Sequence, residues 1–486
     1  MQKSISFLTW ILVIFSILLI PLVIFNKGFL PDDDALRFAA KAVAGKTWPQ
    51  ILVMQNGFMV DPNPGWQAFL QWVHDSWGYG AVDLLAFSVI FLMLLVLFCA
   101  LPWFRRPEAW LGALLTMSVF VPDCATRFAR GRPYVLTDAV LITVLLLWSR
   151  EKEDRPSRLT LVLTTILIAT SAWIEGAWYL LIIPAAPILL VGFIRSACWY
   201  EGCWLAGSFI GCVLTGHPWD FFAQTVRFLF DVFGHSSGNA QLAGELRPSG
   251  GEVDTVLLVA VLLGWRVILR DWNPRVVLNP IFMMVVLGWI LGLEIRRFWW
   301  EWGMPALLIW VALELQNHFE RHISFDSTRR LLITVLLAMG TFLGFTADLD
   351  SRWTKNQSTD YQVLVSTNPD LTGWLPDPGG IVYNSDMEIF YQMFFKDPTA
   401  DWRYVLGFEP GLMLPEDLKV HDKVQADFFS DANDYMPWVN KMRPEDRLII
   451  HKNITYGSVP PQIPELEWHQ VTSTLWIGRL PRSQGH

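Results

Sequence analysis

The sequence predicts an α-helical integral membrane protein with about eleven transmembrane helices and a small soluble α/β domain at its C-terminal end. Of its 486 residues, 53% are hydrophobic and only 17% are charged. Apolar runs of roughly 17–25 residues, the length that crosses a bilayer, recur through residues 1–347. The 26 tryptophans gather near the ends of these runs, where an indole ring keeps its N–H at the polar interface. We therefore assign 1–347 to the membrane domain and 348–486 to a soluble domain.

The net charge of -8 comes from residues 348–486, where 20 acidic side chains stand against 12 basic ones. The membrane domain is therefore nearly neutral. Without a basic surface, the chain has no feature of a nucleic-acid-binding protein. The five cysteines lie in or beside apolar runs and lack metal-ligand spacing to histidine, so we interpret them as small apolar residues.

The predicted spans are the residue ranges 6–26, 81–103, 108–122, 134–148, 159–174, 178–194, 197–215, 253–269, 278–293, 304–317 and 331–347. The first run lacks a small-residue cleavage site and is long enough to span. It therefore predicts a retained helix rather than a signal peptide.

Charge in the short loops predicts the orientation of the spans. Basic residues occur in the segments 105–106, 150–158, 266–275 and 321–330, which alternate correctly for the cytoplasmic side. An odd number of spans then puts the soluble domain on the outer face. The two long loops, 27–80 and 216–252, fall on the same outer face.

The soluble domain contains strand-like runs at 380–383, 404–408, 448–451 and 474–477. Helix-like stretches at 386–395 and 432–441 lie between them. This alternation predicts a small α/β domain, and we find no catalytic motif in it.

Three consecutive carboxylates, Asp32, Asp33 and Asp34, follow the first span. Because they repel one another beside a membrane, one of them is expected to have a raised pKa, which suits a general base. The alternative is structural: the triplet forms the acidic N-terminus of a helix over residues 35–44. Both interpretations remain open at this stage.

The same outer loop continues with a one-sided apolar pattern formed by Trp66, Phe69, Leu70, Val73 and Trp77. The spacing predicts an amphipathic helix over residues 67–77. Such a helix lies either on the membrane surface or packed against the bundle.

Two short outer loops carry arginines that the topological bias disfavours, namely Arg127, Arg130 and Arg132 in one and Arg296 and Arg297 in the other. A guanidinium binds phosphate bidentately, so a lipid-phosphate site is one explanation. Ion pairing with Glu294, with Glu301 or with the aspartate triplet is the other, and for Arg127 it is the favoured one.

Other polar residues of the outer loops are candidates for contact with a substrate, and these are Asp61, Glu175, His217, His235 and Glu301. Glu175 lies in a tight turn between two spans, where it either enters a site or is simply solvated. A single histidine in a loop is more often structural. The sequence has no HExxH motif, P-loop, nucleophile elbow or GxGxxG helix start.

The first outer loop resembles that of a known family. Residues 30–39 read LPDDDALRFA, 45–48 read GKTW, and 63–66 read NPGW. This order resembles GT-C glycosyltransferases that use polyprenyl-phosphate sugars, above all the lipid A aminoarabinose transferases and the protein O-mannosyltransferases. Residues 296–305 (RRFWWEWGMP) and 131–134 (GRPY) resemble further steps of the family, and the likeness covers roughly residues 1–347.

Two departures from the family pattern are visible. The family's Asp-Glu pair aligns best with Asp33 and Asp34, so its second acid is an aspartate here. The Lys-Pro-Pro step of the family reads Asn63-Pro64-Gly65, which removes a lysine.

The resemblance implies inverting transfer of a sugar from a polyprenyl phosphate to a lipid, polysaccharide or protein acceptor, at the outer face of a bacterial-type inner membrane. Asp33 would be the general base, and Arg297, Arg296, Arg132 and Arg130 would bind the donor phosphate. The family implies no required cofactor, although Asp32–Asp34 could hold a divalent cation. The alternative is a membrane transporter or an assembly factor for surface polysaccharide. A transporter should place its charges at the membrane midplane, whereas here they gather in outer loops, which favours the enzyme.

Overall fold

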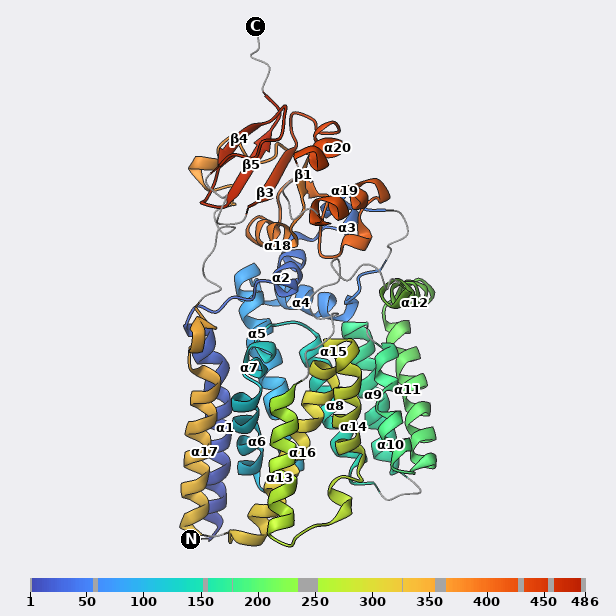
Figure 1. Cartoon of the computed structure of the whole chain (residues 1–486), viewed down its shortest axis with the longest axis vertical. Coiled ribbons are helices and arrows are strands. Elements are labelled where there is room, and N and C mark those ends of the chain that lie inside the picture. The colour runs from blue at the N-terminus through green and yellow to red at the C-terminus, as the bar shows by residue number, and fades with distance from the viewer. Residues whose placement is uncertain are drawn as a thin grey trace.

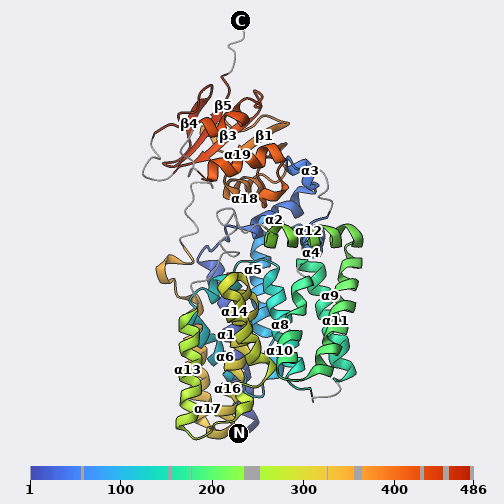
Figure 2. The ribbon, with the colours of Figure 1, turned by 45° about the vertical axis from the view of Figure 1, so that its right-hand side comes forward.

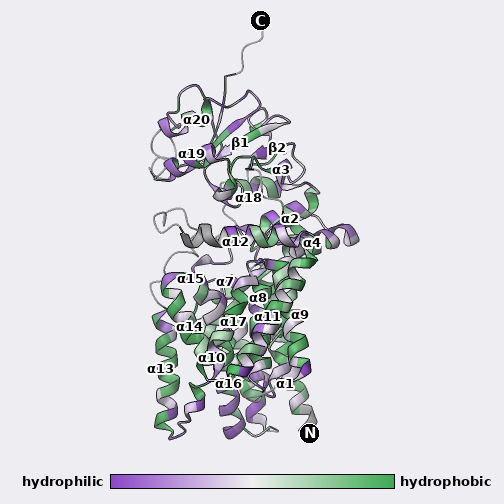
Figure 3. Cartoon of the chain, turned by 90° about the vertical axis from the view of Figure 1, so that its right-hand side faces the viewer, coloured by the Kyte–Doolittle hydropathy of each residue, from purple (hydrophilic) through white to green (hydrophobic). Residues whose placement is uncertain are grey.

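The computed structural model describes residues 2–55, 60–151, 156–176, 178–234, 252–325, 327–354, 364–426, 432–452 and 459–481. A bundle of helices carries a separate C-terminal domain at one end, and the chain begins at the opposite end of the bundle (Figure 1). Figure 3 shows that the bundle is largely hydrophobic and that hydrophilic residues become frequent in the C-terminal domain.

The long bundle helices are α1 (Gln2–Asn26), α5 (Ala81–Phe98), α6 (Pro107–Phe120), α8 (Tyr134–Trp148), α9 (Arg158–Glu175), α11 (Ile194–Leu214), α13 (Val253–Ile268), α14 (Pro280–Glu294), α16 (Met304–His322) and α17 (Thr328–Thr346). Each of them matches one of the predicted spans. Among the described residues, five segments are both long and apolar enough to cross a membrane, namely Ile5–Asn26, Ala81–Trp103, Arg158–Glu175, Ile194–Leu214 and Thr328–Thr346. The chain is thus a multi-pass membrane protein, and the number of eleven spans stays a prediction.

The predicted span 178–194 is wrong as a single helix. It is divided into a short 3-10 helix, Trp178–Ile182, and the helix α10 (Ala185–Leu190). Pro184 and Pro187 lie within this segment, and proline supplies no N–H for a continuous helix.

Several helices begin where the sequence provides a capping side chain. Ser157 caps α9, Ser327 caps α17 and Asn279 caps α14, each by accepting a hydrogen bond from a backbone N–H of the first turn. Pro280 follows as the first residue of α14, a position where its missing N–H costs nothing.

Residues 27–80, predicted as the first outer loop and called by that name below, form three helices between the bundle and the C-terminal domain: α2 (Asp34–Ala44), α3 (Trp48–Ile51) and α4 (Pro64–Trp77) (Figure 2). Helix α12 (Pro218–Gly234) also lies at this end of the bundle, beyond the end of α11.

The predicted amphipathic helix corresponds to α4, and it is packed on the bundle. Trp66, Leu70 and Val73 are buried, and α4 contacts both α2 and α9. Trp77 was expected on the same face but is exposed. The contact with α9 is close, because a Cβ on Gly65 would lie 2.8 Å from the carbonyl oxygen of Trp173. A glycine is therefore required at this crossing.

The C-terminal domain is built on a five-stranded mixed sheet in the order β2-β1-β3-β5-β4. The strands are β1 (Gly380–Asn384), β2 (Trp402–Tyr404), β3 (Arg447–His451), β4 (Glu467–Gln470) and β5 (Leu475–Arg479). β1 pairs in parallel with β2 and β3, and β5 pairs antiparallel with β3 and β4. The α/β prediction is thus met in outline.

Details of this domain differ from the prediction. The second strand ends at Tyr404, where the predicted strand 404–408 begins. β4 and the helix α19 (Pro415–Ala426) were not predicted. Helix α18 (Met387–Lys396) lies close to the expected 386–395, whereas 432–441 forms only a short 3-10 turn followed by α20 (Met436–Val439).

The C-terminal domain and the first outer loop are joined by backbone hydrogen bonds. Leu52 forms a parallel bridge with Tyr404 at the edge of the sheet, and the N–H of Val53 donates to the carbonyl of Tyr404 at 2.8 Å. The Lys46 ammonium donates to the carbonyl of Thr399 at 3.1 Å. Helix α18 packs on α2, so the domain covers the loop that carries the aspartate triplet.

Candidate active site

The start of α2 fixes two of the three aspartates. Asp33 is the N-cap, and its side chain accepts a hydrogen bond from the N–H of Ala35 at 3.4 Å. Asp34 is the first helical residue. The structural interpretation of the triplet therefore holds for Asp33. Asp32 is exposed to solvent.

Three arginines converge on this pair of carboxylates. Arg37 donates to Asp34 at 2.6 Å, Arg132 lies 2.8 Å from Asp34 and 3.6 Å from Asp33, and Arg130 lies 3.2 Å from Asp33. We call these five residues the acid–arginine cluster. Guanidinium groups bind phosphate bidentately, so the cluster supplies the kind of side chain that a phosphate site requires.

The loop before α8 brings Arg130 and Arg132 to α2. Gly131 between them has φ +67°, and a Cβ there would lie 3.1 Å from a methyl group of Val89 and 3.5 Å from Ala35. The positive φ and the close approach both favour glycine. This glycine lets the arginines on either side of it turn toward the same carboxylates.

The two carboxylates of the cluster differ electrostatically. Burial alone would raise the pKa of Asp34, but Arg37 and Arg132 together with hydrogen bonds from Arg37 and Tyr391 hold its pKa at about 2. Burial raises the pKa of Asp33, because Arg132 and Arg130 do not compensate for it, and both aspartate neighbours add to the rise. A raised pKa within the triplet was predicted, and it falls on Asp33.

A second group of charges lies beside the first. Arg297 donates to Glu301 at 2.5 Å and to Glu175 at 3.1 Å, and Thr137 donates to the other oxygen of Glu175. We call these four residues the Glu–Arg cluster. A short π-helix, Trp299–Gly303, holds the buried Glu301 one turn from Arg297. Such π segments are frequent at functional sites.

Asn63 connects the two clusters. Its side-chain oxygen accepts from Arg37 at 3.4 Å, and its side-chain nitrogen donates to the backbone carbonyl of Glu175 at 3.1 Å. The link between the two clusters is therefore an uncharged amide side chain.

The C-terminal domain also reaches the acid–arginine cluster. The Tyr391 hydroxyl donates to Asp34 at 3.0 Å, and the Phe408 ring centroid lies 4.0 Å from the Arg37 guanidinium. The Arg37 side chain is 4% exposed between these groups. Sequence reasoning missed Tyr391, Phe408 and the adjacent Glu409, because no motif marks them in the tail.

The two remaining arginine candidates, Arg296 and Arg127, form long ion pairs. The Arg296 side chain is 44% exposed and lies 3.9 Å from Glu252 and 4.0 Å from Asp123. Arg127 is buried, 4.0 Å from Glu301, and stacks on Tyr134 and Trp300. The ion-pairing interpretation favoured for Arg127 fits this geometry.

Three other predicted site residues are not part of either cluster. Asp61 lies 3.3 Å from Lys41 and accepts from the Trp48 indole at 2.9 Å, so it stabilises the first outer loop. His217 is exposed and lies 3.9 Å from Asp220. His235 lies outside the described residues.

One buried acid was overlooked in the sequence. Asp138 lies one turn into α8 and is fully buried, and within the described part of the chain neither of its carboxylate oxygens has a hydrogen-bond partner. The signal was present, because an acid inside an apolar span is a functional candidate by default.

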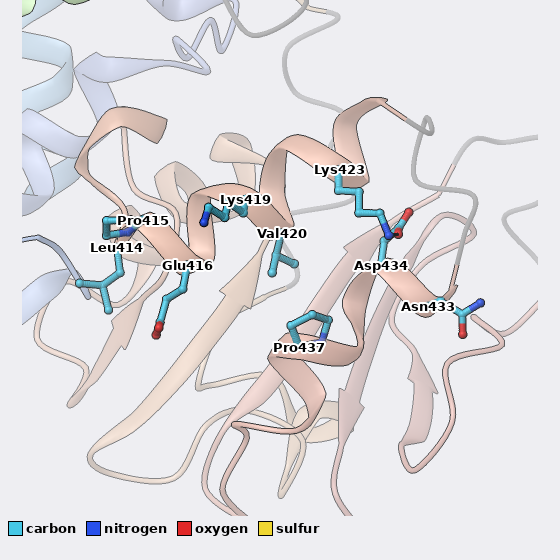
Figure 4. A pocket seen from close by; sticks show the side chains of 9 residues that line it. All are labelled: Leu414, Pro415, Glu416, Lys419, Val420, Lys423, Asn433, Asp434 and Pro437. Carbon is cyan, nitrogen blue, oxygen red and sulfur yellow. Dashed lines mark ion pairs between the residues drawn. The ribbon is translucent and has the colours of Figure 1, made fainter.

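Among the described residues, no three His, Cys, Asp or Glu side chains are grouped so that they could hold a metal ion. A pocket between α19 and α20 in the C-terminal domain is lined by Lys419, Lys423 and Asp434 among others (Figure 4). None of its lining residues belongs to either charged cluster.

Comparisons with known proteins bear on the fold. No protein-family model matches the chain, and no curated protein sequence matches it. The solved structure of ArnT from Cupriavidus metallidurans, bound to undecaprenyl phosphate, is similar with a TM-score of 0.58. The two are 14% identical over 97% of this chain and 98% of that one.

Two further structures are similar at lower scores. The oligosaccharyltransferase of Archaeoglobus fulgidus, with a tethered acceptor peptide, has a TM-score of 0.51 and 11% identity over 92% of this chain and 69% of its own. The arabinofuranosyltransferase AftD from Mycobacteria has a TM-score of 0.52 and 12% identity over 100% of this chain and 40% of its own. The chain therefore has the fold of the GT-C glycosyltransferases, as the motifs of its first outer loop predicted.

Proposed function

We propose that this protein is a membrane glycosyltransferase that moves a sugar from a polyprenyl phosphate to an acceptor on the outer face of the membrane. The observation that carries the proposal is the acid–arginine cluster, which lies at the end of a GT-C-like bundle with three arginines around two carboxylates. The acceptor is a lipid, a polysaccharide or a protein.

The arginines support the donor half of this proposal. A sugar on a polyprenyl phosphate is already activated, so the site must stabilise the leaving phosphate as charge develops on it. Arg130 and Arg132 are partly exposed beside the carboxylates and suit that task. Arg297 is partly exposed and is oriented by Glu175 and Glu301, which suits a guanidinium that stabilises a leaving phosphate.

The difference between the two aspartates supports Asp33 as the general base. With a pKa of about 2, Asp34 is a weak base that is fixed by its partners. The raised pKa of Asp33 brings this carboxylate closer to the range in which a base is effective. Direct displacement by the deprotonated acceptor would invert the anomeric centre and needs no covalent enzyme intermediate.

The direct test is turnover of purified protein with a panel of polyprenyl-phosphate sugars, measured as loss of the lipid donor. At least one donor is expected to be consumed by the wild-type protein and not by an Asp33→Asn variant. A protein that consumes no member of the panel, in detergent or in vesicles, would contradict the proposal and favour a non-enzymatic membrane role.

The orientation is proposed together with the activity. The C-terminal domain and the basic inner segments belong to opposite ends of the bundle, which supports an extracytoplasmic domain in an inner (plasma) membrane protein (Figure 1). Reporter fusions after Arg150 and after Leu349 should give opposite signals. Equal signals at both positions would refute this topology.

A further inference from the structure

Tyr391 belongs to the C-terminal domain and contacts the candidate active site through its hydroxyl group. It lies on α18, which packs on α2 (Figure 1). The Tyr391 side chain is buried, and its hydroxyl donates to Asp34 Oδ1 at 3.0 Å. This hydrogen bond joins residues that are 357 positions apart in the sequence, so it forms only when the domain is docked on the first outer loop.

The Asp34 carboxylate is held at both of its oxygens. Oδ1 accepts from Arg37 Nε at 2.6 Å as well as from Tyr391, and Oδ2 lies 2.8 Å from a guanidinium nitrogen of Arg132. A carboxylate is planar, so the two donors at Oδ1 fix the direction in which Oδ2 points. The position of Arg132 therefore depends on how Asp34 is held at the opposite oxygen.

Arg132 is the arginine that contacts both carboxylates of the acid–arginine cluster. Besides its contact with Asp34, it lies 3.6 Å from Asp33, and its side chain is partly exposed. A group that stabilises a leaving phosphate must be placed accurately, because a misplacement of about 1 Å can cost roughly 10²-fold in rate. A residue that holds Asp34 in place thus influences the phosphate side of the site.

The second donor to Asp34 Oδ1 is held by the same domain. The Arg37 guanidinium lies 4.0 Å from the ring centroid of Phe408 and 4.2 Å from that of Phe38 on α2. Stacking on aromatic rings restricts the orientation of a guanidinium plane. The C-terminal domain therefore acts on Asp34 twice, directly through Tyr391 and indirectly through Phe408 and Arg37.

The docking of the domain does not depend on the Tyr391 hydroxyl. Backbone groups form the bridge between Leu52 and Tyr404, and the N–H of Gln55 donates to the carbonyl of Leu412 at 3.0 Å. These contacts remain when a side-chain oxygen is removed from α18. A change at the site in a Tyr391→Phe variant can therefore be assigned to the lost hydrogen bond.

We propose that Tyr391 is a positioning residue, which fixes Asp34 from the C-terminal domain and so directs Arg132 toward the phosphate of the polyprenyl donor. This inference rests on the proposed function, since it takes the donor phosphate as the ligand of Arg132. It deepens that function by making the docked C-terminal domain a part of the donor site.

The test is a double-mutant cycle of Tyr391→Phe and Arg132→Ala in the full-length protein, with affinity for a polyprenyl phosphate in detergent as the readout. Because this probe carries no sugar, the measurement does not require turnover. Tyr404→Phe is the matched control. It removes another buried hydroxyl of the same domain, which accepts from the Trp402 indole at 2.9 Å, and it leaves the backbone bridge intact. Thermal unfolding midpoints establish that the variants are folded.

We expect Tyr391→Phe to weaken the affinity by about 3–10-fold, within the range of coupling between members of one hydrogen-bond network. Tyr404→Phe should leave the affinity unchanged. In the Arg132→Ala background, Tyr391→Phe should have no further effect, because the side chain through which it acts is gone. A merely structural role of the hydroxyl would instead weaken binding equally in both backgrounds.

Three results would overturn the inference. They are an unchanged affinity in Tyr391→Phe, an equal loss with and without Arg132, and wild-type affinity in Arg132→Ala, which would remove the phosphate from this arginine. Failure of the proposed function is a different result. In that case the wild-type protein itself neither binds the polyprenyl phosphate nor consumes a polyprenyl-phosphate sugar.

Discussion

Arginines pair with acidic side chains at both ends of the helix bundle, but the pairs at the two ends differ in their exposure to solvent and in what surrounds them. At the end where the chain begins, Arg330 binds Glu108 through two nitrogens at 2.7 and 3.0 Å, and Arg106 lies 3.4 Å from the same carboxylate. All three side chains are at most 1% exposed. At the other end, the acid–arginine cluster is partly open, and residues of the C-terminal domain contact it.

The difference shows that residue type alone does not indicate a site. Glu108 and its two arginines connect the starts of α6 and α17 and are sealed from solvent, so they serve the architecture. The acid–arginine cluster has the same chemistry, but it has access to solvent and one carboxylate with a raised pKa. Access combined with a perturbed pKa is the pattern expected of a functional site.

The comparison predicts the largest loss of activity for Asp33. Asp33→Asn removes the proposed base with little change in size, and losing a general base typically lowers the rate by about 10²–10⁴-fold. Expression should survive, because asparagine caps a helix about as well as aspartate. The rate should also fall on the acid side of the pH profile, since a base with a raised pKa becomes protonated at a higher pH. The loss of rate is measured as turnover of the variant and of the wild-type protein at equal expression.

Asp32→Asn is the control for this experiment, because Asp32 is the exposed member of the triplet. A collapse of turnover in Asp34→Asn or Asp32→Asn, with Asp33→Asn close to normal, would show that another carboxylate of the three is the base.

Glu108→Gln should instead reduce stability. It removes the carboxylate that pairs with the buried Arg106 and Arg330, and breaking a buried ion pair typically costs about 3–5 kcal/mol. We expect a lower thermal midpoint in detergent, with donor affinity unchanged in the protein that remains folded. Glu201→Gln, an exposed position on α11, is the matched control. A stable but inactive Glu108→Gln variant would erase the distinction between the two ends.

Arg297→Ala should have a smaller effect, confined to the donor. Losing a hydrogen bond to a charged group reduces affinity by about 10–100-fold. Arg297→Lys should rescue it only in part, because an ammonium cannot reproduce the planar fork that contacts Glu175 and Glu301. Donor KM measures the effect. If the donor KM is unchanged in Arg297→Ala, then Arg297 has a structural role, as Arg330 does.

Removal of divalent cations with EDTA should have the smallest effect, leaving turnover unchanged. The carboxylates of Asp33 and Asp34 already contact guanidinium groups and the Tyr391 hydroxyl, which occupy positions that a cation would need. A loss of turnover that Mg²⁺ or Mn²⁺ restores would assign a cation to the triplet.

The membrane helices could be predicted from the sequence because each is a continuous apolar run. The exception, 178–194, is equally apolar, but its two prolines break the helix without changing its hydropathy. In the C-terminal domain, β4 was missed because the edge strand Glu467–Gln470 is polar and has no hydrophobic alternation. α19 was missed for a related reason, since it is a mostly polar helix.

The candidate site could be predicted only where its residues are close in sequence or carry a motif. Asp33 and Asp34 could be predicted because they belong to a run of three aspartates. Arg132 could be predicted because arginines are unusual in an outer loop. Tyr391 contacts Asp34 although nearly the whole membrane domain separates the two residues in the sequence. No motif near Tyr391 predicts this contact. Asn63 was noted as the loss of a lysine, but its link between Arg37 and Glu175 depends on the folded loop.

The bridge between Leu52 and Tyr404 has a consequence for biosynthesis. The edge of the C-terminal sheet is completed by a segment that leaves the ribosome long before the sheet itself is made. This partner protects the exposed edge from pairing with another chain. A pairing so distant in sequence forms late in folding, since the bundle must first insert. A chain interrupted before α18 would therefore carry the arginines and aspartates but lack the strand and the tyrosine hydroxyl that contact the first outer loop.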